Sequence, residues 1–373
     1  MKVQVQVFDR FETLEVHERE WRALLQENPT RSVFQQRAWM ETWWKHLGQD
    51  CYLRFMVARD PDNRLLGLAP LMLDRHGSMR FIADSNSDYL DFIIPHERET
   101  VLDAFMAELA RRRSEWRSIR LINLRRCSTT LELVLKLARR HGLYPHHRNV
   151  LPAPSLIIRG NEDHVHKLLN KYSLRRAEKK LARKGSIRFR VLDRESASDT
   201  LWETYFAQHR RRSHCAGRKS SFDNPAYCTF VREFFEQANA QGCMEFSLLE
   251  LDGRPVAFHL GFICEERLLW YKPSFDLDLQ MLSPGTVLIR YLIRHAVELG
   301  CQELDFTIGA EDFKNRFATL HRRTDSVHIH ASRLRHIAGW IGHSVWKRLK
   351  PVVQRLRLQL PRPTCPARPR RKH

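Results

Sequence analysis

The sequence predicts an α/β protein of the α+β type, built as two tandem lobes that each combine a mixed, mainly antiparallel sheet with flanking helices. Two observations carry this prediction. The chain has 373 residues, 43% of them hydrophobic, which is enough for two domains of ordinary size. The same order of helical and strand patterns also occurs twice, with an offset of about 185 to 190 residues.

The first copy opens with helical patterns and continues with strands. EVHEREWRALLQ and SVFQQRAWMETWWKHL have apolar residues at helical spacing, and Ser32 is expected to cap the second helix. CYLRFMVARD, LLGLAPLML and MRFIAD predict a meander of three strands. A polar loop, SNSDYLDFIIPH, then leads to a helix at RETVLDAFMAELARRR and a strand at SIRLINL.

The second copy repeats this order. Helices are predicted at ASDTLWETYFAQHRRR and NPAYCTFVREFFEQANAQG, followed by strands at CMEFSLLELD, RPVAFHLGFIC and RLLWYKPSF. A loop, the helix GTVLIRYLIRHAVELG and the strand QELDFTIG complete it. We expect a first lobe at 1–160, a basic linking helix and strand at 161–190, a second lobe at 191–332, and a basic amphipathic helix with a disordered tail at 333–373.

Charge and composition narrow the class of protein. Of the formal net charge of +20, twelve charges lie after Asp325, so the rest of the surface is only mildly basic and does not favour nucleic acid as the main partner. The eight cysteines include no CxxC pair and no zinc-ligand spacing, so we expect no metal. No apolar run is long enough to span a membrane, and we expect a cytoplasmic protein.

Seven short motifs in order resemble one family. SVFQQRAWMETWW, LAPLM, SDYLDF, LRRAEKKLARKG, LDGRPVAFHLGF, the loop from YKPSFD to SPG, and DFTIGAEDFK are similar to the CelD-like (Acetyltransf_6) branch of the GNAT acyltransferases. The resemblance covers about residues 8 to 330, and this branch is similar in turn to the FemAB aminoacyltransferases. It implies two GNAT-like lobes and an acyl-CoA co-substrate, acetyl-CoA or another.

The resemblance places the acyl donor in the second lobe. There the loop LQMLSPGT opens a helix whose first N–H groups can hold a pyrophosphate, and Gly285 lets the backbone approach it. The first lobe has SNSDYLDFIIPHE in this position, so we expect it to be degenerate and to shape the acceptor site. Ser and Pro also begin helices that bind nothing. The expected cofactor-binding residues are Gln280, Ser283, Pro284, Gly285 and Thr286.

Acyl transfer needs a base for the acceptor, donors to the thioester oxygen and an acid for the leaving thiolate. His259, on the strand VAFHLGF, is a candidate base, or else a core histidine. Tyr271 is a candidate acid, or else a packing tyrosine. Lys272 follows it, and strand alternation predicts that it faces the other way.

The segment LDFTIGAEDFKNRF adds two further candidates. Asp305 is expected at the end of a strand, either in the site or accepting backbone N–H bonds. Lys314 is expected to bind phosphate or an oxyanion, or to pair on the helix surface with Glu311 or Asp312. Phe313 stands where the family commonly has tyrosine, which raises the weight of Tyr271 and His259 as the acid. In the first lobe, Asp88, Tyr89 and Asp91 are candidates to face the acceptor, or else members of an Asx-rich loop.

The main hypothesis is an acyl-CoA-dependent N- or O-acyltransferase, with acetyl the expected group, that acts on a saccharide or another envelope-related acceptor. One alternative is FemAB-like aminoacyl transfer from charged tRNA, for which the basic linking helix would contact phosphates instead of being a solvated connector. Another is a non-catalytic scaffold or nucleic-acid-binding protein. HIAGWIGHSVWKRLK predicts a helix that either contacts an anionic membrane at its inner face or docks on the protein's own core. The oligomeric state is not predicted.

Overall fold

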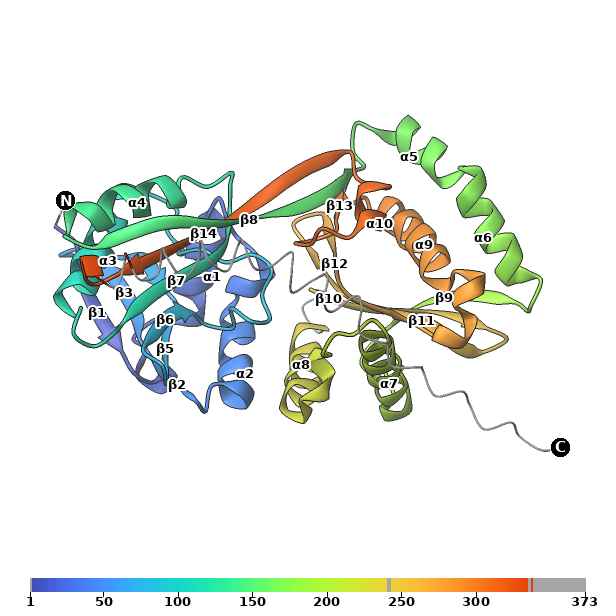
Figure 1. The fold of residues 1–373 in the computed structure, drawn as a ribbon, viewed down its shortest axis with the longest axis horizontal. Coiled ribbons are helices and arrows are strands. Elements are labelled where there is room, and N and C mark those ends of the chain that lie inside the picture. The colour runs from blue at the N-terminus through green and yellow to red at the C-terminus, as the bar shows by residue number, and fades with distance from the viewer. Residues whose placement is uncertain (1, 240–242, 335–336, 338–373) are drawn as a thin grey trace.

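A computed structural model describes residues 2–239, 243–334 and 337, and it confirms the α+β class with two lobes side by side (Figure 1). In the first lobe the helices are α1 (Glu18–Glu27), α2 (Arg37–Leu47), α3 (Arg98–Arg111) and α4 (Thr130–Arg140). Its strands are β1 (Gln4–Phe8), β2 (Cys51–Leu53), β3 (Phe55–Arg59), β4 (Leu65–Ala69), β5 (Leu71–Asp74), β6 (Ser78–Phe81), β7 (Ser118–Arg125) and β8 (Tyr144–Ile157).

The second lobe follows a connecting pair of helices, α5 (Glu162–Leu169) and α6 (Tyr172–Ala182). Its own helices are α7 (Asp199–Cys215), α8 (Pro225–Asn239), α9 (Pro284–Glu298) and the short α10 (Asp312–Asn315). Its strands are β9 (Ile187–Leu192), β10 (Met244–Leu251), β11 (Arg254–Cys264), β12 (Arg267–Phe275), β13 (Glu303–Asp305) and β14 (Leu320–His330). The helices predicted at residues 197–212, 224–242 and 285–300 are therefore present as α7, α8 and α9.

One sheet of eleven strands runs through both lobes, in the order β2-β5-β6-β7-β14-β8-β13-β12-β11-β10-β9, and a small sheet, β1-β3-β4, lies beside it. Two long strands join the halves. β8 pairs with β13 of the second lobe through its last residues, and β14 pairs along most of its length with both β8 and β7 (Figure 1). Because β8 and β14 pair with strands of both lobes, the large sheet is continuous across the predicted boundary between the lobes. Sequence patterns predicted neither strand.

The internal repeat has a clear structural counterpart. In each lobe the last meander strand, a long helix and a parallel strand form one unit, β6-α3-β7 and β12-α9-β13. The entry to the second helix of each lobe also repeats. Ser32 and Ser220 each accept a hydrogen bond from the N–H two residues ahead, that of Phe34 or Phe222, and a 3-10 turn follows before α2 or α8 begins. Ser32 therefore caps this turn and not the α-helix, which corrects our prediction.

The predicted three-stranded meander of the first lobe is also corrected. Each of its first two segments bends at one residue and changes sheets there: at Arg54 the chain passes from the large sheet to the small one, and at Pro70 it passes back to the large one. Pro70 lacks the N–H that a continuous ladder needs, so the strand breaks there into β4 and β5.

The two lobes share one hydrophobic core. Phe34, in the 3-10 turn before α2, and Trp39 of α2 pack against Phe230, Phe262 and Tyr271 of the second lobe, with ring centroids 4.8 to 6.2 Å apart. Burial of such rings fixes how the lobes face each other, and thereby the pockets between them. Among the described residues, no helix is long and apolar enough to cross a membrane.

Candidate active site

Two adjoining pockets lie near the start of α9, and each has a volume of about 270 Å³. The first, which we call the helix pocket, is lined by all five residues predicted to bind the donor: Gln280, Ser283, Pro284, Gly285 and Thr286. The second, which we call the interlobe pocket, contains residues of both lobes. Arg212, Trp270, Pro273 and Phe313 line both pockets and form their common wall.

The opening of α9 follows from its local sequence. Asp276 accepts the N–H of Asp278 and so begins the 3-10 turn η4 (Leu277–Leu282). Ser283 then takes a left-handed conformation, with φ of 57°, and Pro284 occupies the first helical position, where its missing N–H costs nothing. A Cβ added to Gly285 would lie 3.1 Å from the Phe275 ring, so glycine keeps this part of the helix pocket open.

The interlobe pocket brings Asp88 of the first lobe next to Lys272, Thr307 and Lys314 of the second. Burial raises the pKa of Asp88 to about 6, against the partial opposition of the Lys272 and Lys314 charges. A carboxyl with this pKa is largely ionised at neutral pH yet basic enough to accept a proton. The sequence pointed to Asp88 only as a residue that faces the acceptor, because its lysine neighbours come from the other lobe.

Tyr271 and Lys272 both line the interlobe pocket, which corrects the prediction that they face opposite ways. The cause is a β-bulge. Leu260 of β11 pairs with Lys272 and Gly261 pairs with Trp270, so Tyr271 is the extra residue and the alternation of faces is broken there. The bulge lies at the wall that the two pockets share.

The hydroxyl of Tyr271 is held inside the protein. It donates to the Asn86 carbonyl of the first lobe at 2.5 Å and lies 3.1 Å from the Tyr227 hydroxyl. Burial, with the nearby Tyr227 hydroxyl, raises the pKa of Tyr271 well above its usual value. Its role as an acid stays a prediction, but its hydrogen bond ties the pocket wall to the first lobe.

Four basic residues that sequence patterns did not single out also line the interlobe pocket, and they come from one face of α7 and the loop after it. His209, Arg212, Arg218 and Lys219 all line it. Burial and the charges of Lys272 and Arg212 lower the pKa of His209 to about 3, so its ring is neutral. The pocket is therefore strongly electropositive around Asp88.

Lys314 is buried, with 4% of its surface exposed, and does not lie on an open helix surface. Its ammonium donates to the Ile308 carbonyl at 2.9 Å and pairs with Glu311 at 3.0 Å. Both partners belong to the turn that the sequence TIGAED forms, so Lys314 holds that turn against the interlobe pocket. Phe313, beside it, packs on Trp270 with ring centroids 6.1 Å apart.

His259 is fully buried and lines neither pocket. Its ring stacks on Trp270 at 5.1 Å, and its Nδ1 lies 3.7 Å from the Glu245 carboxylate. Burial alone would raise the pKa of Glu245, but the neighbouring His259 and His295 rings bring that pKa down to about 2. The structure thus places His259 behind the pocket wall, as a support for Trp270, and gives it no direct path to an acceptor.

Asp305 and Tyr89 face a different cavity. They line a wide cleft of about 1150 Å³ between the lobes, and the Tyr89 hydroxyl donates to Asp305 at 2.7 Å. Asp305 also accepts the N–H of Thr307 at 2.7 Å, as the alternative interpretation of a strand-end aspartate expects. Burial, with the charge of Glu303, raises the pKa of Asp305. This pair joins the lobes behind the interlobe pocket.

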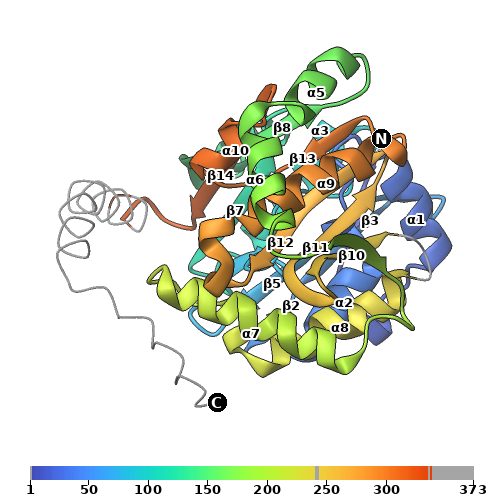
Figure 2. The same ribbon diagram turned by 90° about the vertical axis from the view of Figure 1, so that its right-hand side faces the viewer.

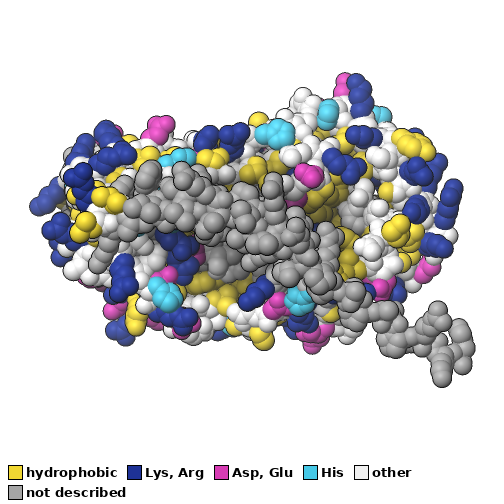
Figure 3. All heavy atoms as spheres, in the orientation of Figure 1, with side chains coloured by type: hydrophobic (Ala, Val, Ile, Leu, Met, Phe, Trp, Pro, Cys, Tyr) yellow, Lys and Arg dark blue, Asp and Glu magenta, His cyan; other side chains and the backbone are white. Residues whose placement is uncertain are grey.

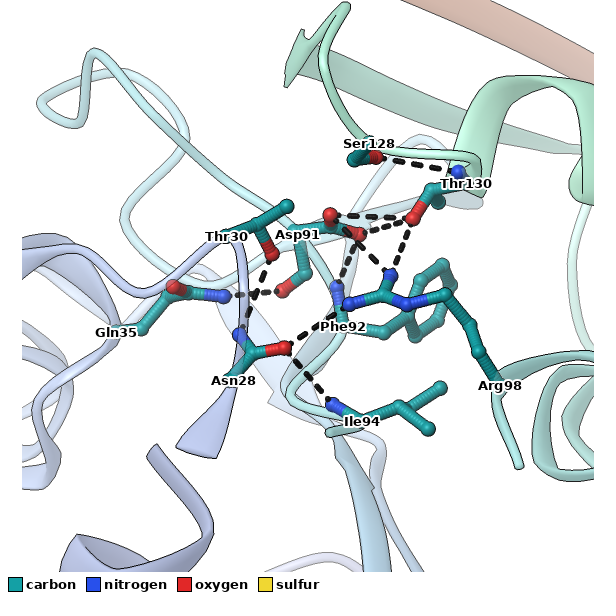
Figure 4. A network of polar contacts seen from close by, with 9 residues as sticks. All are labelled: Asn28, Thr30, Gln35, Asp91, Phe92, Ile94, Arg98, Ser128 and Thr130. Carbon is teal, nitrogen blue, oxygen red and sulfur yellow. Dashed lines mark hydrogen bonds and ion pairs between the residues drawn. The ribbon is translucent and has the colours of Figure 1, made fainter. Parts of the chain in front are cut away.

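Asp91 is not brought to either pocket. It is buried inside the first lobe, where it accepts hydrogen bonds from the Thr130 hydroxyl at 2.8 Å and from the N–H of Phe92, and pairs with Arg98 at 3.4 Å (Figure 4). Arg98 also donates to Asn28. The prediction that Asp91 faces an acceptor is therefore corrected, because its carboxylate is already bonded to three groups of its own lobe. The predicted C-terminal helix, apart from Ile337, lies outside the described residues.

Comparisons with known proteins give a domain family that matches part of the chain and several solved structures with a similar fold. Residues 170–315 match the model of the acetyltransferase (GNAT) domain family. The crystal structure of FemX is similar with a TM-score of 0.60 at 12% identity, over 87% of this chain and 97% of that one. A tandem GNAT protein from the clavulanic acid biosynthesis pathway gives 0.51 at 13% identity, over 89% and 99%.

The C-terminal domain of a putative lysylphosphatidylglycerol synthetase from Agrobacterium fabrum gives a TM-score of 0.51 at 12% identity, over 88% of this chain and 95% of that one. A search of the curated proteins found no match. At such identities the solved structures show a common fold. Residues 170–315 thus match an acetyltransferase (GNAT) domain, and the chain as a whole has the fold of FemX and of the tandem GNAT protein.

Proposed function

We propose that the protein is an acyl-CoA-dependent N- or O-acyltransferase that moves an acetyl group to a polar acceptor, a saccharide or another envelope-related molecule. One observation carries the proposal. Two pockets share a wall, and one of them lies at the start of the GNAT helix α9 while the other contains an ionisable carboxylate. This is the arrangement that direct transfer between two bound substrates requires.

The donor would occupy the helix pocket. Its pyrophosphate would lie at the first turn of α9, where free N–H groups and the helix dipole favour anions, and Gly285 permits close approach. The acyl arm would then reach the common wall at Trp270 and Phe313. The bulge at Tyr271 leaves a peptide group there outside the strand ladder, and its N–H is a candidate donor to the thioester oxygen.

The acceptor would occupy the interlobe pocket, with Asp88 as the general base. The acceptor nitrogen or oxygen attacks the thioester carbon, and its proton passes to Asp88. The new C–N or C–O bond replaces the C–S bond as CoA leaves as the thiolate. The thiolate takes a proton from solvent, and Asp88 returns its own proton to solvent. Lys272 and Lys314 keep part of the carboxylate population ionised. This assignment replaces the predicted base His259, which is buried behind Trp270.

The chemistry of the pocket wall suggests the kind of acceptor. Ser213 and Ser221 offer hydroxyl groups, and Arg218, Lys219 and Lys272 offer positive charge. A hydroxyl-rich molecule with an anionic group, such as a charged saccharide, would find partners for both features. An apolar acceptor would leave them without partners.

A binding experiment tests the donor class. Acetyl-CoA and bulk tRNA are each titrated against the protein by calorimetry, and an acetyl-CoA reaction with mixtures of envelope saccharides is followed by mass spectrometry for a gain of one acetyl group. We expect acetyl-CoA to bind and an acetylated saccharide to form.

The alternatives predict different results. Affinity for tRNA that falls steeply with salt, combined with no affinity for acetyl-CoA, would favour FemAB-like aminoacyl transfer and overturn the proposal. No affinity for either donor would favour a non-catalytic scaffold.

A further inference from the structure

A basic groove of about 1020 Å³ runs between α6 and η4, next to the helix pocket. Its walls carry five Lys or Arg residues and no Asp or Glu: Arg175, Arg176, Lys179, Lys180 and Arg183. Figure 2 shows α6 lying alongside α9, and in Figure 3 Lys and Arg side chains gather at this end of the molecule. A groove of one charge sign attracts an anionic ligand.

The helix α6 has a buried face and a basic face, and this explains why the groove residues carry charge of one sign. Leu174 and Leu181 are buried in the core that includes α9. Glu178, the one acid of α6, points to the same side and binds Arg290 and Arg294 of α9. The acid is thus withdrawn from the groove.

The opposite face of α6 carries Arg176, Lys179, Lys180 and Arg183, at spacings of three, four and seven residues that place them on one stripe. Within the part of the chain that the structure describes, no ion pair joins these four residues to an acid. Surface lysines and arginines elsewhere on this protein commonly have such partners, as Lys45 does with Glu233 and Arg112 with Glu108.

The groove is continuous with the helix pocket. Ser283 lines both, and the Lys180 ammonium donates to the Met281 carbonyl at 2.6 Å, which anchors α6 to the loop that enters α9. A ligand whose arm lies in the helix pocket would therefore extend, past Ser283, into a groove lined with cations.

We propose that this groove binds the phosphorylated nucleotide end of the acyl donor, so that Arg176, Lys179 and Arg183 contact the 3′-phosphate and ribose side of acyl-CoA. The inference rests on the proposed function and adds a second anchoring site to it. It divides the donor between two sites: the pyrophosphate at the first turn of α9 and the 3′-phosphate on α6. Lys180 has a different task, because its ammonium is bonded to the Met281 carbonyl.

The test compares acetyl-CoA with acetyl-3′-dephospho-CoA, which lacks only the 3′-phosphate. Both are titrated against the wild type and against the triple variant R176Q/K179Q/R183Q. In the wild type, loss of the phosphate should raise Kd by about 10-fold or more, as expected for lost charge-assisted hydrogen bonds. In the variant, the two ligands should bind with Kd values within about 2-fold of each other.

A matched control removes three charges from another exposed helix. The variant K136Q/R139Q/R140Q, on α4 of the first lobe, should keep the wild-type discrimination between the two ligands. Glutamine preserves helix propensity in both variants, so both should fold. A salt titration of the wild type gives a second readout, since Kd for acetyl-CoA should rise more steeply with ionic strength than Kd for the dephospho ligand.

Each of the following three outcomes would overturn the inference. If acetyl-CoA and its dephospho form bind the wild type equally, the α6 site is refuted while the proposed function stands. If neither ligand binds, both fall together. If the triple variant keeps the discrimination but loses affinity for tRNA, the groove belongs to RNA.

Discussion

The same β-α-β unit occurs in both lobes, but the space at the start of its helix differs. Side chains fill this space in the first lobe, whereas it forms a pocket in the second. In the first lobe, α3 begins with Arg98, whose guanidinium reaches Asp91 and Asn28 in a closed internal network (Figure 4). In the second lobe, α9 begins with Pro284 and Gly285, which leave the helix pocket open. The first residues of each helix thus decide whether the unit stabilises the protein or can hold a ligand.

The first lobe also contributes a residue to the interlobe pocket. The SDYLDF loop places Asp88 in the interlobe pocket, Tyr89 against Asp305, and Asp91 in the internal network. Three acidic or hydroxyl side chains within four residues therefore have three different surroundings. The first lobe thus contributes polar side chains to the contacts between the lobes.

The largest effect is expected for Asp88→Asn. Loss of the proposed base should lower kcat/KM by about 100-fold or more, the usual contribution of a general base. In the wild type, kcat/KM should rise about tenfold per pH unit up to the Asp88 pKa of about 6 and then level off. That acidic limb should be missing in the variant. An unchanged rate and pH profile would exclude Asp88 as the base.

Asp88→Asn should have an opposite effect on stability. The pKa of Asp88 is higher in the folded protein, about 6, than the ordinary value near 4. The folded state then binds more protons in this window, so the stability contribution of Asp88 falls as pH rises through it. The variant should melt at or above the wild-type temperature at pH 8, and the difference should shrink below pH 4.

Asp91→Asn is the matched change inside the filled lobe. It leaves the buried Arg98 guanidinium without its ion partner, which should lower the free energy of unfolding by about 3 kcal/mol. Chemical denaturation measures the loss. Because Asp91 lines neither pocket, kcat/KM of the folded variant should stay within about twofold of the wild type. A large loss of activity without a loss of stability would reverse the roles that we assign to Asp88 and Asp91.

Gly285→Val tests the hollow end of α9. The added side chain would press on Phe275 and fill the helix pocket, so Kd for acetyl-CoA should rise by about 10-fold or more. Glu99→Val is the control, since Glu99 is the second residue of α3 as Gly285 is of α9. It should leave Kd unchanged. Equal effects of the two variants would mean that the helix pocket is not the donor site.

The smallest effect is expected for Phe313→Tyr, which restores the residue common in the family. Phe313 lines both pockets, but the proposed mechanism does not need a hydroxyl group at this position. We expect kcat to change by less than about 3-fold, as for a conservative change at a pocket wall. A rise of an order of magnitude, in initial rates at saturating acetyl-CoA, would indicate that a tyrosine acid is missing from this chain.

Much of the fold follows from local patterns. The apolar spacing in GTVLIRYLIRHAVELG and the turn SPG located α9 and its entry, because helix periodicity and caps are written in adjacent residues. The same is true of the strands β10 to β12. The long strands β8 and β14 were not predicted, since His146, Arg148, Pro152 and Pro154 interrupt the strand pattern of β8.

The site could be predicted only in part. The residues proposed to bind the donor lie within one short segment, 280–286, so a sequence pattern could group them, and the structure places them around one pocket. The bulge at Tyr271 depends on strand register, which alternation alone cannot reveal. The meeting of Asp88 with Lys272 and Lys314 depends on how two lobes pack, and the burial of His259 behind Trp270 depends on the same packing.

We infer that one lobe of the two holds a donor site. The most direct test is a calorimetric titration of wild-type protein with acetyl-CoA, read for stoichiometry. We expect one site per chain, at which a crystal of the complex would show pyrophosphate at the first turn of α9. Two sites per chain, or a single site with its pyrophosphate at the first turn of α3, would contradict it.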